Sequence, residues 1–214
     1  MLLVVDSATP ACSAALLGSD LRLIDERHEL VGRGHAEKLV PMIEELLAGR
    51  RPSAILVDAG PGSFTGVRVG LAAAHGLAIG WGVPLTAYSS LAAIAATAGE
   101  SEVEVAVALE GGHGQLFVQS FRHGPLAPLD ALRSLAPDEA AAAIRAPLVL
   151  GSGAESLVSA RGFGEARQAL PRAAAARLLP QALRSLPPSP IYGRAADAKP
   201  VLSDAAGGVQ GPMP

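Results

Sequence analysis

The first half of the chain begins with strand-like runs of apolar residues and continues with apolar positions at helical spacing. Three runs, at residues 2–6, 12–17 and 21–26, predict antiparallel strands, with a turn at residues 18–20 between the last two. Apolar side chains three and four positions apart then predict a helix over residues 35–48. Pro41 lies inside this helix and should kink it or displace its start.

From residue 54 onward, predicted strands and helices alternate. The expected elements are a strand at 54–58, a helix that follows a glycine-rich loop and ends near residue 80, a strand at 85–88 and an alanine-rich helix at 90–98. Three antiparallel strands followed by this alternation is an unusual order of elements.

After residue 99 the pattern begins again. Strands are predicted at 103–109, 115–121 and 148–150, and helices at 138–145, 154–160 and 172–186. We therefore expect an N-terminal subdomain over residues 1–98, a smaller C-terminal subdomain over 99–198 and a flexible tail over 199–214. The chain is rich in proline, glycine and alanine from residue 187, where residues 191–194 could form one docked element.

The glycine-rich loop at residues 60–66 is the strongest candidate for a binding site. Strand, glycine turn and helix is the arrangement in which α/β folds place ligands, and the exposed helix N-terminus suits an anion. The loop lacks the lysine of a P-loop, so tight packing remains the alternative. Asp58, just before the loop, has the same ambiguity. The candidate nucleotide-binding residues are Asp6, Ser7, Gly60, Gly62, Ser63 and Thr65.

The helix after this loop is apolar almost all round. Between Val67 and Trp81 only Arg68 and His75 are polar. Such a helix is buried on most sides, and a protein this small has little left to cover its second face. A partner subunit is therefore expected there, although both helices could instead be internal layers of one domain. The candidate interface residues are Leu39, Ile43, Leu47, Val67, Gly70, Leu71, Ala74 and Trp81.

Composition narrows the function classes. The net charge is -3 and aromatic residues make up 3% of the chain, so strong RNA binding by this chain alone is not expected. Cys12 is the single cysteine, which excludes an internal disulfide and agrees with a reducing cytosol. Apolar stretches are interrupted before membrane-spanning length, so we expect a cytoplasmic protein that has no membrane partner. The histidines show no metal-site spacing, and no catalytic set is complete.

Three motifs carry a resemblance to a known family. Residues 4–8 read Val-Val-Asp-Ser-Ala, residues 35–43 read His-Ala-Glu-Lys-Leu-Val-Pro-Met-Ile, and residues 60–68 read Gly-Pro-Gly-Ser-Phe-Thr-Gly-Val-Arg. These stretches resemble the bacterial TsaB family, closely as far as about residue 96. Residues 114–117 and 190–194 resemble later landmarks of the same family.

The resemblance implies an α/β fold of the actin-like, ribonuclease-H-like type, with two subdomains of mixed sheets flanked by helices. It also implies a non-catalytic scaffold subunit of the machinery that places threonylcarbamoyl on the tRNA adenosine beside the anticodon. The implied partner is the catalytic subunit TsaD, with the ATPase TsaE joining through the complex and tRNA contacted only indirectly. Alone, the chain could form a homodimer. No cofactor would be required, while weak ATP or ADP binding is left open.

Two departures bear on chemistry. TsaD carries the metal motif Asn-His-Leu-Glu-Gly-His after the strand equivalent to residues 85–88, but here Ser90 and Ile94 stand in place of both histidines. The second is at residues 110–117, which lack the arginine of the family's Asp-Ala-Arg pattern. The alternative function is a small ATP-dependent phosphotransferase that uses Asp6 and the glycine loop.

Overall fold

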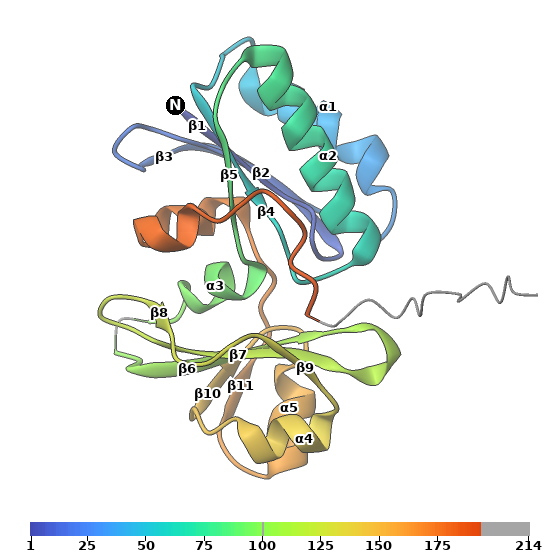
Figure 1. The fold of residues 1–214 in the computed structure, drawn as a ribbon, viewed down its shortest axis with the longest axis vertical. Helices are drawn as coiled ribbons and strands as arrows, with labels where there is room; N and C mark the ends of the chain where they lie inside the picture. The colour runs from blue at the N-terminus through green and yellow to red at the C-terminus, as the bar shows by residue number, and fades with distance from the viewer. Residues whose placement is uncertain (100, 194–214) are drawn as a thin grey trace, which may run out of the picture.

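The computed structural model describes residues 1–99 and 101–193. Two mixed β-sheets lie one above the other, with a short helix between them and longer helices on their outer faces (Figure 1). Among the described residues, no helix combines the length and the apolar character needed to cross a bilayer.

The first sheet has five strands in the order β3-β2-β1-β4-β5. Their bounds are β1 Leu2–Asp6, β2 Ala11–Leu17, β3 Leu23–Leu30, β4 Ala54–Asp58 and β5 Leu85–Tyr88. β1 to β3 form an antiparallel meander, whereas β1, β4 and β5 are parallel. Val5 pairs with Val57, and Asp58 pairs with Tyr88. The carboxyl ends of these three strands therefore meet at one edge.

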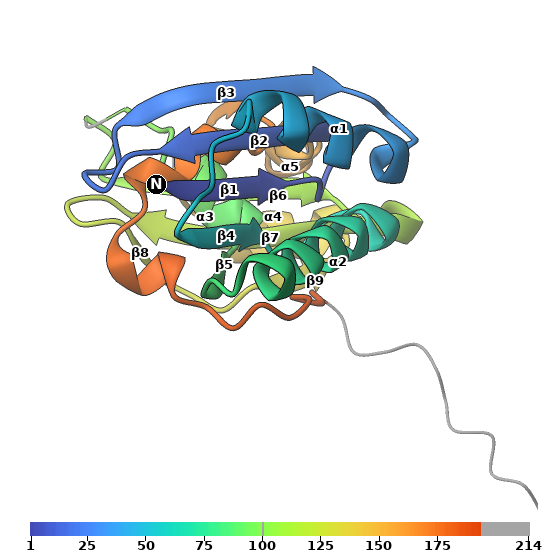
Figure 2. The same ribbon diagram turned by 90° about the horizontal axis from the view of Figure 1, so that it is seen from above.

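Two helices cover the outer face of this sheet, as Figure 2 shows from above. They are α1, His35–Leu47, and α2, Phe64–Trp81. α2 begins where the Ser63 hydroxyl accepts a hydrogen bond from the Gly66 amide, and it ends at Gly82, whose left-handed backbone is easiest for glycine. Apolar side chains of both helices pack with β-strand residues in one buried cluster. α1 runs through Pro41 without interruption.

The second sheet repeats the first with fewer residues. Its elements are β6 Glu104–Glu110, β7 Leu116–Arg122, β8 Ala127–Pro128, β9 Arg133–Leu135, α4 Pro137–Ala143, β10 Leu148–Leu150, α5 Ala154–Arg161 and β11 Glu165–Arg167. The order is β11-β10-β6-β7-β8, with β6 antiparallel to β7 and parallel to β10. β6 thus takes the place of β1, β10 that of β4 and α5 that of α2. This repeated unit is the actin-like architecture of the predicted α/β class.

One shared core joins the two sheets. Helix α3, Ser90–Ala95, lies between them together with the 3-10 helix η2, Ala173–Leu178. Val4 and Leu56 from the first sheet share a buried cluster with Val105 and Val107 from the second. A further 3-10 helix, η3 at Gln181–Arg184, and the segment after it return to the first half. Leu186 exchanges both backbone hydrogen bonds with Ala87 of β5.

Several predicted bounds were wrong. β3 spans Leu23–Leu30 rather than 21–26, because a hydrogen-bonded turn from Gly18 to Arg22 takes up the first positions. The helix expected at 172–186 is two separate 3-10 helices, since Pro180 between them has no N–H for a continuous helix. α3 ends at Ala95, before the predicted residue 98. Strands β8, β9 and β11 and the 3-10 turn η1, Gly112–Gly114, were not predicted.

The division into subdomains over 1–98 and 99–198 remains a prediction, and the tail expected at 199–214 lies outside the described residues. Within the described part, residues 173–191 pack against the first sheet, and η2 also belongs to the core shared by both sheets. Arg194, expected in the docked element, is also outside the described part.

Candidate functional site

Two aspartates meet at the carboxyl edge of the first sheet. Asp6 ends β1 and Asp58 ends β4, and both side chains are 1% exposed. The Asp58 carboxylate accepts hydrogen bonds from the Gly60 amide at 2.7 Å and from the Ser90 hydroxyl at 2.8 and 2.7 Å. Asp6 Oδ1 accepts one from the Ala8 amide at 3.1 Å. The pair follows directly from the parallel pairing of β1 and β4.

Tyr88 completes this cluster from the end of β5. Its side chain is fully buried, and neither its hydroxyl nor Asp6 Oδ2 has a hydrogen-bond partner among the described residues. Sequence reasoning did not single out Tyr88. Polar residues at the ends of three successive parallel strands are the signal that could have found it, once the strand order was known.

Burial dominates the electrostatics of the cluster. It raises the pKa of Asp6 well above its ordinary value, and the negative charge of Asp58 adds to the effect. Burial also raises the pKa of Asp58 to about 7, against hydrogen bonds from Gly60 and Ser90 that lower it. The Tyr88 pKa is raised well above its ordinary value by burial and by the nearby carboxylates.

The glycine loop packs against the turn that follows β1. A Cβ added to Gly62 would lie 2.0 Å from the Ala8 carbonyl oxygen, and one added to Gly66 would lie 2.1 Å from the Ser7 carbonyl oxygen. The Ser63 amide donates to the Ala8 carbonyl at 2.6 Å. Glycine is therefore required here for close backbone approach, the tight-packing alternative of the sequence reading.

The candidate nucleotide-binding residues are thus engaged within the chain. The Ser7 hydroxyl donates to the Gly66 carbonyl at 2.8 Å, and the Ser63 hydroxyl caps α2. Gly60 donates its amide to Asp58, while Thr65 is exposed on the first turn of α2 and apart from the buried acids. The structure brings Asp6, Ser7 and the glycine loop together, but around protein contacts.

Ser90 and Ile94, at the positions equivalent to TsaD's histidines, are also buried. The Ser90 hydroxyl binds Asp58, and the Ile94 side chain lies in the core shared by the two sheets. Among the described residues, no group of three or more histidine, cysteine, aspartate and glutamate side chains could hold a metal ion.

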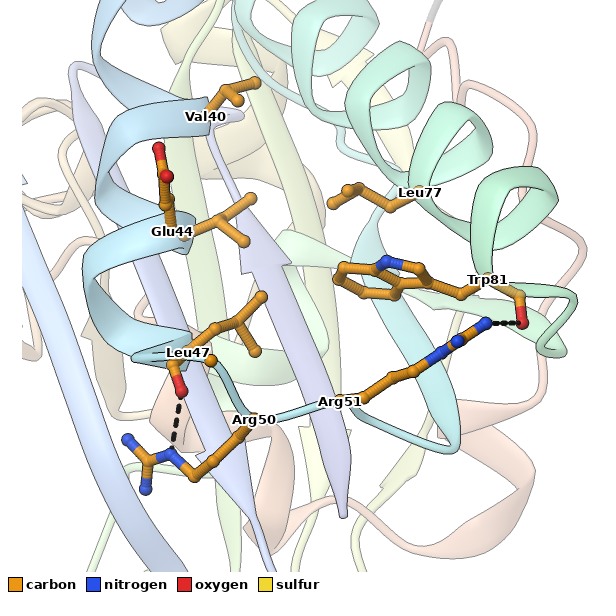
Figure 3. A pocket seen from close by; sticks show the side chains of 9 residues that line it. Val40, Glu44, Leu47, Arg50, Arg51, Leu77 and Trp81 are labelled. Carbon is orange, nitrogen blue, oxygen red and sulfur yellow. Dashed lines mark hydrogen bonds between the residues drawn. The ribbon is translucent and has the colours of Figure 1, made fainter.

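The outer faces of α1 and α2 form the second candidate site. A groove of about 470 Å³ lies between the two helices near their C-terminal ends (Figure 3). Leu77 and Trp81 of α2 face Val40 and Leu47 of α1 across it. At its mouth, Arg51 donates a hydrogen bond to the Trp81 carbonyl at 2.7 Å. The lining residues are Val40, Ile43, Glu44, Leu47, Gly49, Arg50, Arg51, Leu77 and Trp81.

Most of the residues expected at a partner interface are buried within the chain. Ile43, Leu47 and Trp81 line the groove, and Trp81 is half-buried. The other members of the set do not line it and are buried: Leu39, Val67, Gly70, Leu71 and Ala74. Periodicity identified the apolar faces of both helices but could not separate the face against the sheet from the outer face. The large apolar side chains of α1 and α2 that are exposed are Ile79 at 81%, Phe64 at 61% and Val40 at 51%.

The C-terminal segment borders this helical surface. The Pro188 carbonyl lies 3.0 Å from the His75 ring, and the Ile191 amide donates to the Ala59 carbonyl at 2.8 Å. The Tyr192 hydroxyl accepts a hydrogen bond from Arg68, whose guanidinium also lies 3.5 Å over the Phe64 ring. The two polar residues of α2 thus fix this segment to the helix.

A smaller depression of about 280 Å³ occupies the equivalent edge of the second sheet. Its lining residues are Glu110, Gly111, Gly114, Gln115, Leu116 and Ser156, which include part of the stretch that departs from the family pattern. Glu110 takes the topological place of Asp6, but its side chain is exposed.

Comparisons with known proteins agree with this geometry. Residues 28–164 match the family model described as TsaD, tRNA N6-adenosine threonylcarbamoyltransferase. The TsaB protein of Haemophilus influenzae is 44% identical over 106 residues, which cover 46% of this chain and 43% of that protein. The Escherichia coli TsaB protein is 37% identical over 99 residues, covering 44% and 42% respectively. The match thus spans less than half the length of either relative.

A solved structure extends the likeness over most of the chain. It is a Pseudomonas aeruginosa protein described as uncharacterised and similar to the peptidase YeaZ. The two superpose with a TM-score of 0.75 at 28% identity, and the alignment covers 90% of this chain and 99% of that one. Both halves of the fold are therefore shared with that structure.

Proposed function

Because the chain belongs to the TsaD family of tRNA N6-adenosine threonylcarbamoyltransferases, and within it to the TsaB family, we propose that it acts in tRNA threonylcarbamoyladenosine biosynthesis as a non-catalytic subunit. Its role is to bind TsaD through the outer surface of α1 and α2, and to meet TsaE through the resulting complex. Contact with tRNA is indirect, and a homodimer can occupy the same surface when TsaD is absent.

The closed carboxyl edge of the first sheet supports the non-catalytic part of this proposal. In an actin-like enzyme this edge must admit a phosphate-bearing substrate, but here Gly62 and Gly66 lie directly against the backbone of Ser7 and Ala8. Opening the edge would break the packing that holds α2 on the sheet. The same closure counts against the phosphotransferase alternative.

The surface of α1 and α2 is the observation that carries the binding role. Val40 lines the groove together with Leu77 and Trp81, and Ile79 projects outward from another side of α2. Small residues on the outer side of α2, such as Ala72 and Gly76, allow another helix to approach closely. Apolar centres with arginines at the margin are typical of protein interfaces, and tryptophan is enriched among residues that dominate binding energy.

Ile79→Asp tests the interface. Because Ile79 is 81% exposed, the substitution leaves the fold intact but places a charge in the proposed contact. We expect the affinity for TsaD, measured by calorimetric titration of the purified chain, to fall by about tenfold or more. Val103→Asp is the matched control, since Val103 is 78% exposed and lies before the second sheet. Val103→Asp should bind normally.

A loss of TsaD binding can be distinguished from misfolding of the variant. Both variants should keep the circular dichroism spectrum and the melting temperature of the parent chain. Equal TsaD affinity for Ile79→Asp and the parent would refute the helical interface, and weakened binding by both variants would show that the effect is not local. ATP with magnesium, titrated into the isolated chain, should produce neither saturable binding heat nor turnover. Turnover would favour the phosphotransferase instead.

A further inference from the structure

The cluster of Asp6, Asp58 and Tyr88 has a property that the scaffold role does not use. All three side chains are at most 1% exposed. Neither aspartate belongs to any of the ion pairs formed among the described residues. Two buried carboxylates without a cation destabilise the fold when both are ionised, because each loses its hydration and repels the other.

The hydrogen bonds around the pair are unequal. Asp58 accepts hydrogen bonds from the Gly60 amide and the Ser90 hydroxyl, which stabilise its carboxylate form. Asp6 receives one backbone hydrogen bond through Oδ1, and its Oδ2 has no partner among the described residues. The environment therefore favours a negative charge on Asp58 and a neutral Asp6.

We propose that Asp6 and Asp58 share one proton in the folded chain, carried on Asp6 and donated to Asp58, so that this pair is a pH-sensitive latch beneath the glycine loop. The directions of the pKa changes agree with this assignment. Burial raises the pKa of both acids. Beyond burial, the interaction with Asp58 raises the pKa of Asp6, which Tyr88 lowers to a smaller extent, whereas the interaction with Asp6 lowers the pKa of Asp58. The coupled pair titrates as a unit.

Among the described residues, no positively charged group contributes to the pKa of either aspartate. β5 contributes Tyr88, whose pKa is raised, and β2 contributes Cys12, whose pKa is raised to about 11 by burial and the charge of Asp6. β3 adds only the acidic influence of Glu26 and Glu29 on these groups. The neighbouring positions on α2 and α3 are Gly66, Gly70 and Ser90, none of which ionises.

The latch is connected to the start of α2 through two short paths. Asp58 holds the Gly60 amide at 2.7 Å. Asp6 holds the Ala8 amide, and the Ala8 carbonyl in turn accepts a hydrogen bond from the Ser63 amide at 2.6 Å. A second negative charge at Asp6 would thus strain the loop that fixes the N-terminus of α2.

The sign of the pH dependence follows from the raised pKa values. In the unfolded chain both carboxyls lose their protons near the ordinary value of 3.8. The folded chain keeps both protons to higher pH and gives up the Asp58 proton first, which leaves the single shared proton on Asp6. The stability contributed by the pair is therefore complete below the ordinary value. The stability is lost as the pH rises through the folded values, about 7 for Asp58 and well above the ordinary value for Asp6. For each proton that the folded chain holds and the unfolded chain has lost, the unfolding equilibrium constant rises about tenfold for every unit of increase in pH.

Asp6→Asn is the decisive variant, because asparagine keeps the shape of the neutral acid and cannot ionise. We expect urea unfolding of the isolated chain to show a steep loss of stability from about pH 5 to pH 8 in the parent and a much flatter profile in Asp6→Asn. At about pH 8 the variant should unfold with an equilibrium constant roughly tenfold smaller than that of the parent. Asp20→Asn, which neutralises an exposed carboxylate, should follow the parent profile.

Parallel profiles for the parent and Asp6→Asn would overturn the proposal. If the variant fails to fold, infrared spectroscopy of the parent chain provides the test. The spectrum near neutral pH must contain the carbonyl stretch of a protonated carboxyl group. Its absence would refute the shared proton. Stabilisation of the parent at about pH 8 by added potassium or magnesium would also refute it, because a cation would then hold the pair. Since no partner is present, the result does not depend on the proposed TsaD interface.

Discussion

The two halves of this chain share the same strand order, but the carboxyl edge of the sheet is closed in the first half and open in the second. In the first half, the carboxyl ends of β1 and β4 bury two aspartates, and the following loop closes over them. In the second half, Glu110 at the end of β6 is exposed beside an open depression. The helix launched from this edge has 18 residues in the first half and 8 in the second. The closed edge thus supports the long helix that the proposed interface requires.

The largest effect should come from breaking the close approach of the glycine loop. Gly66→Ala places a Cβ about 2.1 Å from the Ser7 carbonyl oxygen, where both neighbours are backbone and cannot move aside. We expect a loss of about 3 kcal/mol or more in the free energy of unfolding, measured by urea denaturation.

The matched change in the second half is Gly153→Ala, at the start of α5. The nearest atom to its Cβ would be the end of the flexible Leu116 side chain, 2.6 Å away, and the nearest backbone atom would be the Ala108 carbonyl oxygen at 3.3 Å. The expected loss is roughly 1 kcal/mol. Equal losses at Gly66 and Gly153 would contradict the view that the start of α2 depends more on close backbone contact than the start of α5.

A moderate effect should follow removal of the hydroxyl that solvates Asp58. Ser90→Ala deprives a buried carboxylate of a donor at 2.7 Å, and we expect a loss of about 1–3 kcal/mol in urea denaturation near neutral pH. Ser152→Ala is the counterpart in the second half, where the hydroxyl accepts from the exposed Glu110 amide. That variant should lose less than about 0.5 kcal/mol. A larger loss for Ser152→Ala would reverse the ranking of the two edges.

The smallest effect concerns the outer side of α2. Nothing lies within 4 Å of a Cβ added to Gly76. Since glycine is a poor helix former, Gly76→Ala should stabilise the isolated chain by about 0.5–1 kcal/mol, seen as a higher melting temperature. A lower melting temperature would show that this side of the helix is not open in the isolated chain.

The sequence predicted the elements whose patterns are strong. β1, β4 and β5 are short apolar runs with clear ends, and α2 has an apolar run too long for a strand. β3 was misplaced because it is an exposed edge strand rich in charged residues, which hides the alternation. The alanines between residues 172 and 186 suggested one helix, but burial against the first sheet selected 3-10 turns.

The candidate site was harder to predict than the fold. Asp6 and Asp58 were each noted beside their turns, but they meet because β1 pairs with β4. The two aspartates are 52 residues apart in the sequence (58 minus 6), so no local pattern links them. Helical periodicity also gave Leu71 and Ala74 as interface residues, although both lie against the sheet. Which side of an apolar helix a sheet covers is a property of the tertiary fold.

The hydrogen bonds between Leu186 and Ala87 have a consequence for synthesis on the ribosome. β5 is the last strand of the first sheet, and among the described residues its outer edge pairs with a segment made about a hundred residues later (186 minus 87 is 99). Until that segment leaves the exit tunnel, the nascent first half carries an unpaired strand edge, a feature that promotes wrong association. We expect the first half to remain dependent on chaperones until this segment has been made and released from the tunnel.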